Sequence, residues 1–376
     1  MSIFMIKPKG HSTQLGLKTG GNFIFGLKKP LFKYRKKYTI TENSGSDLLD
    51  YQVLIEETTS SVFSLAKNDG SDIRFFTEDG TCLPYWIEKW DADNNNAKIW
   101  VKVPSIPASG QVSIYAYFGN PELVSASSPE LTFIRVIDGC VLALPMDEGS
   151  GDTVYDKSGN DNDGTIYGGA TWTDGKFGKA LNFDGEDDYV EVLDSESLKI
   201  MGDLTMIAWV YPELDVSIYQ GICGKGKAGE GFMAVDTRNE DYQLAWRQGD
   251  GSNEYAHNFL NFFVLGEKWY FVVVVRDENT LKAYRDGEFF DSLTFSYTVG
   301  ATSINFYVGR REDGWYFNGL IDEVRIYNRA LSEEEIQNLY NYYGYNTENY
   351  PGKTLVRKKV DSEPSVDISS AIETLL

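Results

Sequence analysis

Carboxylate and amide side chains gather in the segment 156–164, Asp-Lys-Ser-Gly-Asn-Asp-Asn-Asp-Gly. Ca²⁺ takes about six to eight oxygen ligands, which proteins supply from such side chains and from loop carbonyls. Asp156, Asn160, Asn162 and Asp163 are therefore the candidate calcium ligands in this segment. The same residue types are also the preferred turn formers and need no metal for that role. The pattern leaves a calcium loop and a plain turn open.

A second group of acids lies at 186–191, Glu-Asp-Asp-Tyr-Val-Glu. On a strand with a bulge, Glu186, Asp188 and Glu191 would share one face, and carboxylates about 5–5.5 Å apart form the nucleophile and acid/base of retaining glycosidases. The chain otherwise offers little for catalysis, because it has only two histidines and no Ser–His–Asp or Cys–His arrangement. We therefore expect no enzymatic activity, with glycoside hydrolysis as an alternative.

Aromatic side chains beside loops could bind a glycan, because a ring stacks on the apolar face of a sugar. The chain has 24 tyrosines and 8 tryptophans, so most of them must be core residues or cross-strand pairs. The candidates for ligand binding are those that adjoin loops: Trp172, Tyr219, Trp246, Tyr255, Trp315 and Tyr316.

The elements that would position these residues are β-strands. Residues 204–211 and 269–275 have the β-branched and aromatic content of buried sandwich strands, and Asp286-Gly287 indicates a hairpin turn. Many such strands with turn signals between them predict two-sheet sandwiches. One helix is expected after Ser332, which forms a capping box with Glu335.

Four blocks of the second half resemble the laminin-G-like, concanavalin-A-like jelly-roll family. They are 142–151, 154–166, 178–190 and 319–332. The resemblance implies a module that binds or scaffolds rather than catalyses, and that ends with the packing helix. It also implies that the first and last strands lie side by side, which would bring Asp322 and Glu323 towards the candidate calcium loop. Calcium in related jelly rolls is usually structural.

The acidic block at 186–191 also has the spacing of the Glu-x-Asp-x-x-Glu motif of laminarinase-type glycosidases. Asp187, however, stands where that motif has an apolar residue. The block coincides with the Phe-Asp-Gly-x-Asp-Asp-Tyr-Val sequence of the laminin-G-like family. The resemblance therefore favours the non-enzymatic interpretation.

The first half resembles an uncharacterised bacterial and archaeal β domain that often precedes laminin-G-like modules. The matching blocks are 34–40, 72–75, 83–88, 99–104 and 115–121. The predicted fold class is all-β with two β-sandwich domains, the second a concanavalin-A-like jelly roll. The expected organisation is an extended N-terminal arm (1–33), a first β domain (34–130), the jelly roll (138–343) with its short C-terminal helix, and a tail (344–376).

Charge is distributed unevenly along the chain. The net charge is −21, yet residues 1–37 contain nine Lys or Arg and no Asp or Glu. The acidic body argues against nucleic-acid binding, while a basic arm on such a body usually has a partner. Alternatively the arm is a solvated, flexible terminus. Its candidate assembly residues are Lys7, Lys9, Lys18, Phe23, Phe25, Lys28 and Lys29, and its Phe-Ile-Phe run could add a strand to a neighbouring sheet edge.

The start of the sequence does not resemble a secretory signal, and no stretch approaches the length of a membrane span. Laminin-G-like modules ordinarily work outside cells. Together these points predict a structural component of a virus or phage particle, such as a capsid decoration, tail or fibre protein on the virion surface. It would be a homo-oligomer, attached through the arm and displaying a jelly roll that binds a glycan or a protein. The alternative is a secreted or cell-surface carbohydrate-binding adhesin.

Overall fold

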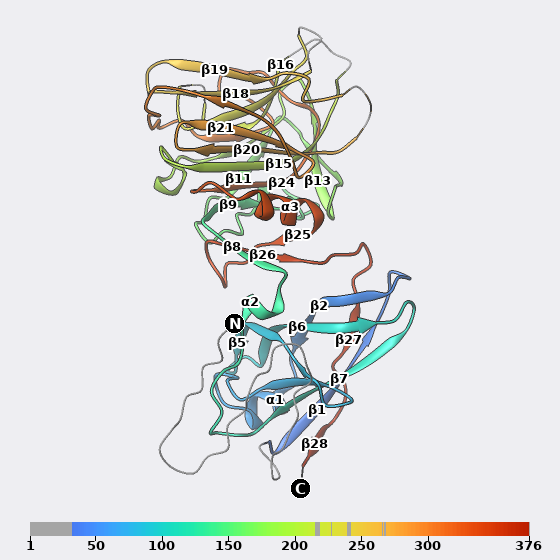
Figure 1. The fold of residues 1–376 in the computed structure, drawn as a ribbon. Helices are drawn as coiled ribbons and strands as arrows, with labels where there is room; N and C mark the ends of the chain where they lie inside the picture. The colour runs from blue at the N-terminus through green and yellow to red at the C-terminus, as the bar shows by residue number, and fades with distance from the viewer. Residues whose placement is uncertain are drawn as a thin grey trace. The chain divides into compact units, whose positions relative to one another are not determined.

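A computed structural model describes residues 32–214, 219–226, 228–238, 242–264, 266 and 268–375. The predicted assembly residues Lys7, Lys9, Lys18, Phe23, Phe25, Lys28 and Lys29 lie outside these ranges. The chain divides into two compact units: unit 1 comprises the residues up to Ile134 together with Lys358–Leu376, and unit 2 is Arg135–Arg357 (Figure 1). Within the described ranges, no helix combines the length and apolar character needed to cross a membrane.

Unit 1 is a sandwich of two antiparallel sheets. One sheet has the order β27 (Ser365–Asp367), β1 (Tyr34–Thr41), β7 (Gln111–Phe118), β3 (Arg74–Thr77) and β4 (Cys82–Leu83), and β28 (Ile372–Thr374) also pairs with β1. The other has the order β2 (Leu48–Glu57), β6 (Asn96–Ile106) and β5 (Tyr85–Asp91). The short helices α1 (Ser60–Leu65) and α2 (Pro129–Thr132) complete the unit. Its core consists of alternating apolar residues from both sheets, as the period-two patterns predict.

An ion pair is buried inside unit 1. Lys36 of β1 and Glu57 of β2 are both 0% exposed, and the Lys36 Nζ atom lies 2.8 and 3.0 Å from the two Glu57 carboxylate oxygens. The same carboxylate accepts hydrogen bonds from the Tyr38 hydroxyl and from the Thr59 backbone N–H. A buried charge is tolerated only with such complete pairing. Part of the basic N-terminal charge is therefore structural.

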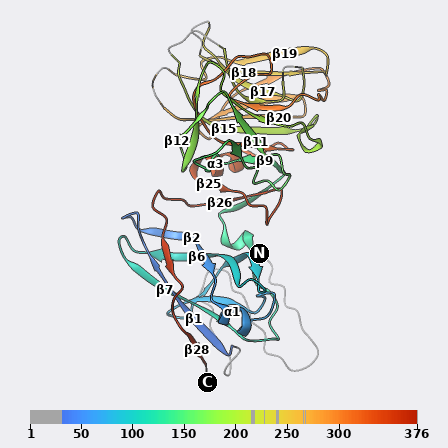
Figure 2. The same cartoon turned by 180° about the vertical axis from the view of Figure 1, so that it is seen from behind.

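The segment 344–376 is not a tail separate from the domains. Lys353–Arg357 forms β26, which pairs with β8 (Arg135–Asp138) and β25 (Tyr343–Tyr345) in unit 2. The chain then returns to unit 1, where β27 and β28 lie beside β1 (Figures 1 and 2). The apolar side chains of Val366 and Ile372 pack against the unit 1 core, which is the physical reason for this return.

Unit 2 is a jelly roll of two stacked eight-stranded sheets. Sheet A has the order β10 (Thr153–Val154), β11 (Gly164–Tyr167), β14 (Tyr189–Val192), β23 (Phe306–Val308), β16 (Tyr219–Gly224), β17 (Phe232–Asp236), β18 (Gln243–Gly249) and β19 (Glu254–Phe259). Sheet B has the order β12 (Thr171–Asp174), β13 (Lys179–Asp184), β24 (Asn318–Tyr327), β15 (Leu204–Pro212), β20 (Tyr270–Asp277), β21 (Thr280–Arg285) and β22 (Glu288–Thr294). One more strand, β9 (Cys140–Leu144), pairs with β24. The main core lies between the sheets and takes residues from both.

The predicted packing helix is α3 (Glu333–Asn341). The Ser332 hydroxyl accepts a hydrogen bond from the Glu335 backbone N–H, and the Glu335 carboxylate accepts one from the Ser332 N–H, so the capping box is present. Ile336 and Leu339 are the buried residues of this helix. The hairpin expected at Asp286-Gly287 joins β21 to β22.

Candidate functional site

The strands β16, β17 and β18 of sheet A are buried on both faces. Their inner face contributes to the core between the sheets. On the outer face, Tyr219 packs with Phe232, Ala234 and Ala245 in a separate small apolar cluster. This outer face is covered by aromatic and arginine side chains, some of which come from the loop 309–317.

Trp315 is the most exposed aromatic group at this face. It is 41% exposed, whereas the other seven tryptophans, all of which lie in described ranges, are buried or half-buried. Its carbonyl accepts a hydrogen bond of 2.8 Å from the Gly221 N–H, and Arg311 and Gly314 exchange two backbone hydrogen bonds of 3.1 Å. These contacts hold Trp315 at φ 68°, with its ring edge-to-face against Tyr219 at 5.6 Å between centroids.

Three arginines surround the Tyr219 ring. The guanidinium carbons of Arg238, Arg247 and Arg311 lie 5.0, 5.3 and 5.5 Å from its centroid. Each arginine also forms ion pairs with acids at the same face. Arg238 pairs with Asp236 at 2.8 Å, and Arg247 pairs with Glu254 at 3.4 Å. Arg311 pairs with Asp313 at 2.7 Å and with Glu254 at 3.3 Å. We call these residues together with Tyr219 and Trp315 the aromatic–arginine face. The arginines were not predicted from the sequence.

The hydroxyl group of Tyr219 is buried at the centre of this face without a hydrogen-bond partner. Burial raises the pKa of Tyr219 to about 12, although the neighbouring Arg247 and Arg311 oppose the shift. The phenol therefore stays neutral at ordinary pH. A buried polar group without a partner is uncommon in folded proteins, and this one is a hydrogen-bond donor beside the exposed Trp315.

The other predicted aromatic residues lie elsewhere. Trp246 is completely buried, and its indole N–H donates to the Gln248 side chain, so it cannot stack on a ligand. Trp172 is half-buried on β12 of sheet B. Tyr255 of β19 is stacked on Tyr297 with 3.8 Å between centroids.

Tyr316 follows Trp315 in the chain but lies in a neighbouring group of side chains. Its ring is 6.5 Å from that of Tyr189. The Arg310 guanidinium sits over Tyr189 at 3.7 Å and over Tyr307 at 4.3 Å. Of the six predicted aromatics, the structure brings Tyr219 and Trp315 into one site.

The candidate calcium loop is an internally hydrogen-bonded turn attached to β9. The Asp156 carboxylate accepts from the backbone N–H groups of Ala143, Ser158 and Asn162 at 2.9, 2.9 and 3.1 Å, and Asp163 accepts from the Asp156 N–H at 2.8 Å. These oxygens already have partners, as the plain-turn interpretation requires. Calcium binding by this loop stays a prediction.

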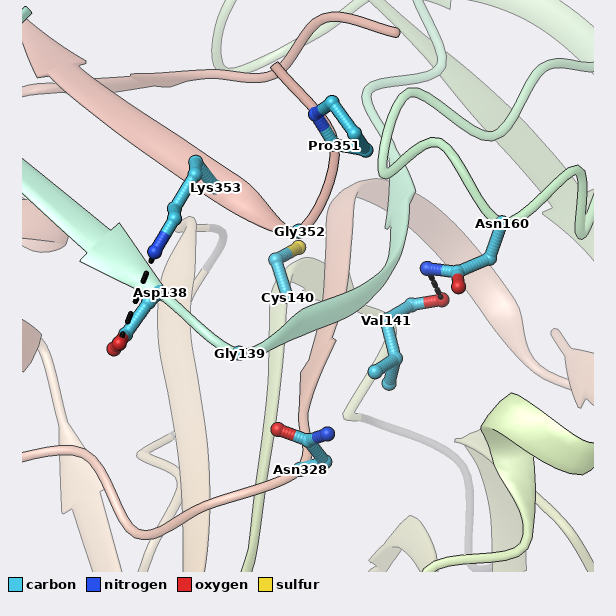
Figure 3. Close-up of a pocket in the computed structure, with 9 residues that line it drawn as sticks. All are labelled: Asp138, Gly139, Cys140, Val141, Asn160, Asn328, Pro351, Gly352 and Lys353. Atoms are coloured by element: carbon cyan, nitrogen blue, oxygen red, sulfur yellow. Dashed lines mark hydrogen bonds and ion pairs between the residues drawn. The ribbon is translucent and has the colours of Figure 1, made fainter.

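A polar pocket of about 450 Å³ adjoins this loop. Its lining residues are Asp138, Gly139, Cys140, Val141, Asn160, Asn328, Pro351, Gly352 and Lys353. Figure 3 shows the Asn160 amide nitrogen directed at the Val141 carbonyl, at 3.3 Å, and the Lys353 ammonium facing Asp138 at 3.8 Å. Asn162 also donates to the Val141 carbonyl, at 3.0 Å. The two predicted asparagine ligands therefore turn their nitrogens to the same backbone oxygen.

β9 pairs with β24 as the resemblance implied, through Val324–Tyr327, and Asp322 and Glu323 directly precede this paired stretch. Both are buried, but the Asp322 carboxylate accepts from the N–H groups of Lys176 and Phe177 at 2.9 and 3.0 Å. Burial, with the nearby Glu323 and Asp147 charges, raises the pKa of Asp322 well above its ordinary value. The hydrogen bonds from Lys176 and Phe177 thus attach Asp322 to a different turn from the one that contains Asp156.

The residues of the glycosidase-like motif do not share one strand. Glu186 lies in the loop between β13 and β14, whereas Glu191 lies in β14 and accepts a hydrogen bond from Asn305 at 3.0 Å. Asp188 is 3% exposed. Burial raises its pKa, and the charges of Asp184 and Asp187 add to the shift, while a hydrogen bond from the Asp184 backbone lowers it. The strand geometry on which the glycosidase alternative depended is absent from this described segment.

Comparison with known proteins accords with this architecture. Residues 184–337 match the concanavalin A-like lectin/glucanases superfamily. Unit 2 carries a concanavalin A-like domain. Residues 69–141 match a domain of unknown function, DUF2341, which confirms the uncharacterised family predicted for the first half. A comparison with curated proteins finds no match.

Several solved structures are similar to the chain. Domain 4 of the extracellular arabinanase AbnA from Geobacillus stearothermophilus, in complex with arabinotriose, is 21% identical, with a TM-score of 0.44 over 54% of this chain and 98% of that domain. The binding domain of Paraclostridial Mosquitocidal Protein 1 is 18% identical (TM-score 0.43; 57% and 55% covered). The receptor-binding domain of the botulinum neurotoxin C/D mosaic serotype is 16% identical (TM-score 0.43; 54% and 51% covered). The chain thus spans about half the length of these two toxin domains.

Proposed function

We propose that unit 2 is a non-catalytic carbohydrate-binding module and that the aromatic–arginine face holds the glycan. The observation that carries this proposal is Trp315, the single exposed tryptophan, held rigidly against Tyr219. A fixed aromatic ring with polar groups around it provides the two parts of a sugar site, a stacking surface and hydrogen bonds to hydroxyls. The match to a lectin/glucanases superfamily supports the same class of ligand.

The charge balance at the face favours a neutral sugar. The three arginines stand beside three acids, Asp236, Glu254 and Asp313, with which they pair. An anionic ligand would have to compete with these carboxylates. Sugar hydroxyls, by contrast, can donate to the carboxylates and accept from the guanidinium groups without disturbing the net charge.

Replacement of Trp315 by alanine tests the proposal. The side chain is 41% exposed, which leaves roughly 100 Å² of the about 250 Å² that a tryptophan can bury. A sugar that covers half to all of this area contributes about 1.3–2.5 kcal/mol, so Trp315→Ala should weaken binding by about 10- to 70-fold. Isothermal titration of the full chain with neutral gluco-, xylo-, manno-, galacto- and arabino-oligosaccharides measures the effect.

Phe289→Ala is the matched control, because Phe289 is 50% exposed on β22 of the opposite sheet. It should leave glycan binding unchanged. If no oligosaccharide binds the wild-type chain, or if both variants bind as well as the wild type, the glycan proposal is wrong at this face. If the face binds a protein and no glycan, the ligand of the jelly roll is a protein and the glycan proposal is wrong.

The module's biological setting is also proposed, on the basis of the basic arm. With six basic and no acidic residues among residues 1–33, the arm would attach the chain to an acidic surface of a virus or phage particle. Deletion of residues 1–31 should leave both units folded and abolish incorporation into the particle, as seen by electron microscopy. Normal incorporation of the truncated chain would favour the secreted or cell-surface adhesin.

A further inference from the structure

Three carboxylates converge at the end of β13 and in the loop that joins it to β14. One ligand oxygen from each of Asp184, Asp187 and Asp188 lies within 4.8 Å of the others. Asp184 and Asp187 are exposed, whereas Asp188 is buried. No other group of three or more histidine, cysteine or acidic side chains within the described ranges meets this spacing. Like charges this close repel one another, and the loop needs a reason to hold them together.

The Asp188 side chain provides a second, independent observation. It is 3% exposed, and its Oδ2 atom accepts a hydrogen bond of 3.0 Å from the Asp184 backbone N–H. Its Oδ1 atom is buried and has no hydrogen-bond partner. A buried carboxylate oxygen without a partner is costly, and a cation would remove that cost.

The turn at Gly168-Gly169 packs against the same loop. A Cβ atom on Gly168 would lie 2.3 Å from the Asp187 carbonyl oxygen, and one on Gly169 would lie 3.7 Å from Asp188 Oδ1. The two glycines have φ of 83° and 130°, which L side chains rarely adopt. The turn therefore comes close enough to the unpartnered oxygen to shield it from bulk solvent while leaving space beside it.

We propose that Asp184, Asp187 and Asp188 form a binding site for a hard divalent cation, Ca²⁺ in preference to Mg²⁺ or Zn²⁺. The donors are all oxygen atoms, as Ca²⁺ prefers. Zinc is disfavoured because the site has none of the nitrogen and sulfur ligands that zinc prefers. Two of the three carboxylates are exposed and leave coordination positions to water, which the flexible geometry of Ca²⁺ accepts. This site is separate from the 156–163 loop, where both Asp156 oxygens accept hydrogen bonds, whereas Asp188 Oδ1 accepts none.

The site adjoins the loop that carries Trp315. Asp184 is the cross-strand partner of Asn318 at the start of β24, and Gly185 packs against the Asn318 side chain. Tyr189, which follows Asp188, holds the Arg310 guanidinium at 3.7 Å. A bound cation would therefore stiffen both ends of the 309–317 loop. The cation site itself does not depend on the glycan proposal.

Calcium titration of the full chain tests the site. Isothermal calorimetry with CaCl₂, and melting of unit 2 in CaCl₂ against EDTA, should show binding and a higher melting temperature with calcium, because a ligand of the folded state alone stabilises it. Asp184→Asn and Asp187→Asn alter exposed side chains and should fold normally, yet each should weaken binding by about tenfold or more. Asp188→Asn should do the same while keeping an oxygen for the Asp184 N–H.

Glu186→Gln is the matched control, because it removes the same charge from the same loop outside the group of three. It should change calcium affinity by less than about threefold. The proposal is overturned if the wild-type chain binds no calcium, or if Asp184→Asn and Asp187→Asn bind it as tightly as the wild type. Loss of binding in Asp163→Asn together with full binding in Asp187→Asn would also overturn it, by assigning the metal to the 156–163 loop.

Discussion

Lys36→Met would measure what the buried ion pair contributes to unit 1. The substitution removes the ammonium group that lies 2.8 and 3.0 Å from the Glu57 oxygens and keeps most of the apolar stem. Glu57, which is 0% exposed, would retain the Tyr38 hydroxyl at 2.5 Å and the Thr59 N–H at 2.7 Å as donors. It would have no counter-charge. Breaking a buried pair in this way costs about 3–5 kcal/mol, mostly because one charge is left uncompensated.

The double variant Lys36→Met/Glu57→Gln separates charge from packing. Glutamine keeps an oxygen for Tyr38 and Thr59 but carries no charge, so it should recover about half of the lost stability, or about 2 kcal/mol. Urea unfolding monitored by hydrogen exchange of β1 and β2 peptides gives the free energy of unfolding of unit 1. Peptides from unit 2 serve as the internal control.

Two results would refute this reasoning. A loss of less than about 1 kcal/mol in Lys36→Met would place the pair among ion pairs that contribute little. A double variant no more stable than Lys36→Met would mean that packing, and not the uncompensated charge, accounts for the loss.

Three further predictions concern pH, the C-terminal strands and a close contact. Burial acts to raise the pKa of Glu57, but hydrogen bonds from Lys36, Thr59 and Tyr38 outweigh it and lower the pKa below its ordinary value of 4.5. The ionised Glu57 should therefore stabilise unit 1 fully above that pH, and this stabilisation should disappear on acidification. Urea midpoints of unit 1 measured across this pH range would show the loss. Truncation after residue 364 removes β27 and β28 and should lower the melting temperature of unit 1 alone, measured by calorimetry. Gly231→Ala places a Cβ atom 2.2 Å from the Trp246 ring, at a residue with φ 147°. It should destabilise unit 2 by about 3 kcal/mol in a thermal melt. The control Gly202→Ala, whose Cβ would have nothing within 4 Å, should leave the melt nearly unchanged.

Much of the β structure follows from local pattern. The capping box at Ser332 and the hairpin at Asp286-Gly287 involve residues a few positions apart, so the chain itself contains the necessary information. The strands β27 and β28 were missed because each has only three residues. Their stability comes from pairing with β1, more than three hundred residues earlier, and no local signal reports such pairing.

The aromatic–arginine face shows where sequence reasoning stops. Trp246 and Trp315 have the same residue type and both adjoin loops, yet one is 0% and the other 41% exposed. The difference depends on how the sheets stack and on how the 309–317 loop returns over β16. The arginines were missed for a related reason. Arg247 lies on β18, whereas Arg238 follows β17 and Arg311 lies in the 309–317 loop. At such positions an arginine is expected to face solvent and not to pack over the ring of Tyr219.

The way the chain leaves and re-enters unit 1 has a consequence for biosynthesis. During vectorial translation, β1 and its sheet emerge first, but its outer edge stays open until residues 365–374 have left the ribosome. All of unit 2, Arg135–Arg357, is made in the meantime. Unit 2 can therefore fold before unit 1 is complete. An open strand edge is a template for pairing with other nascent chains. Cells that make this protein should therefore need to protect β1 for the time taken to translate more than two hundred residues.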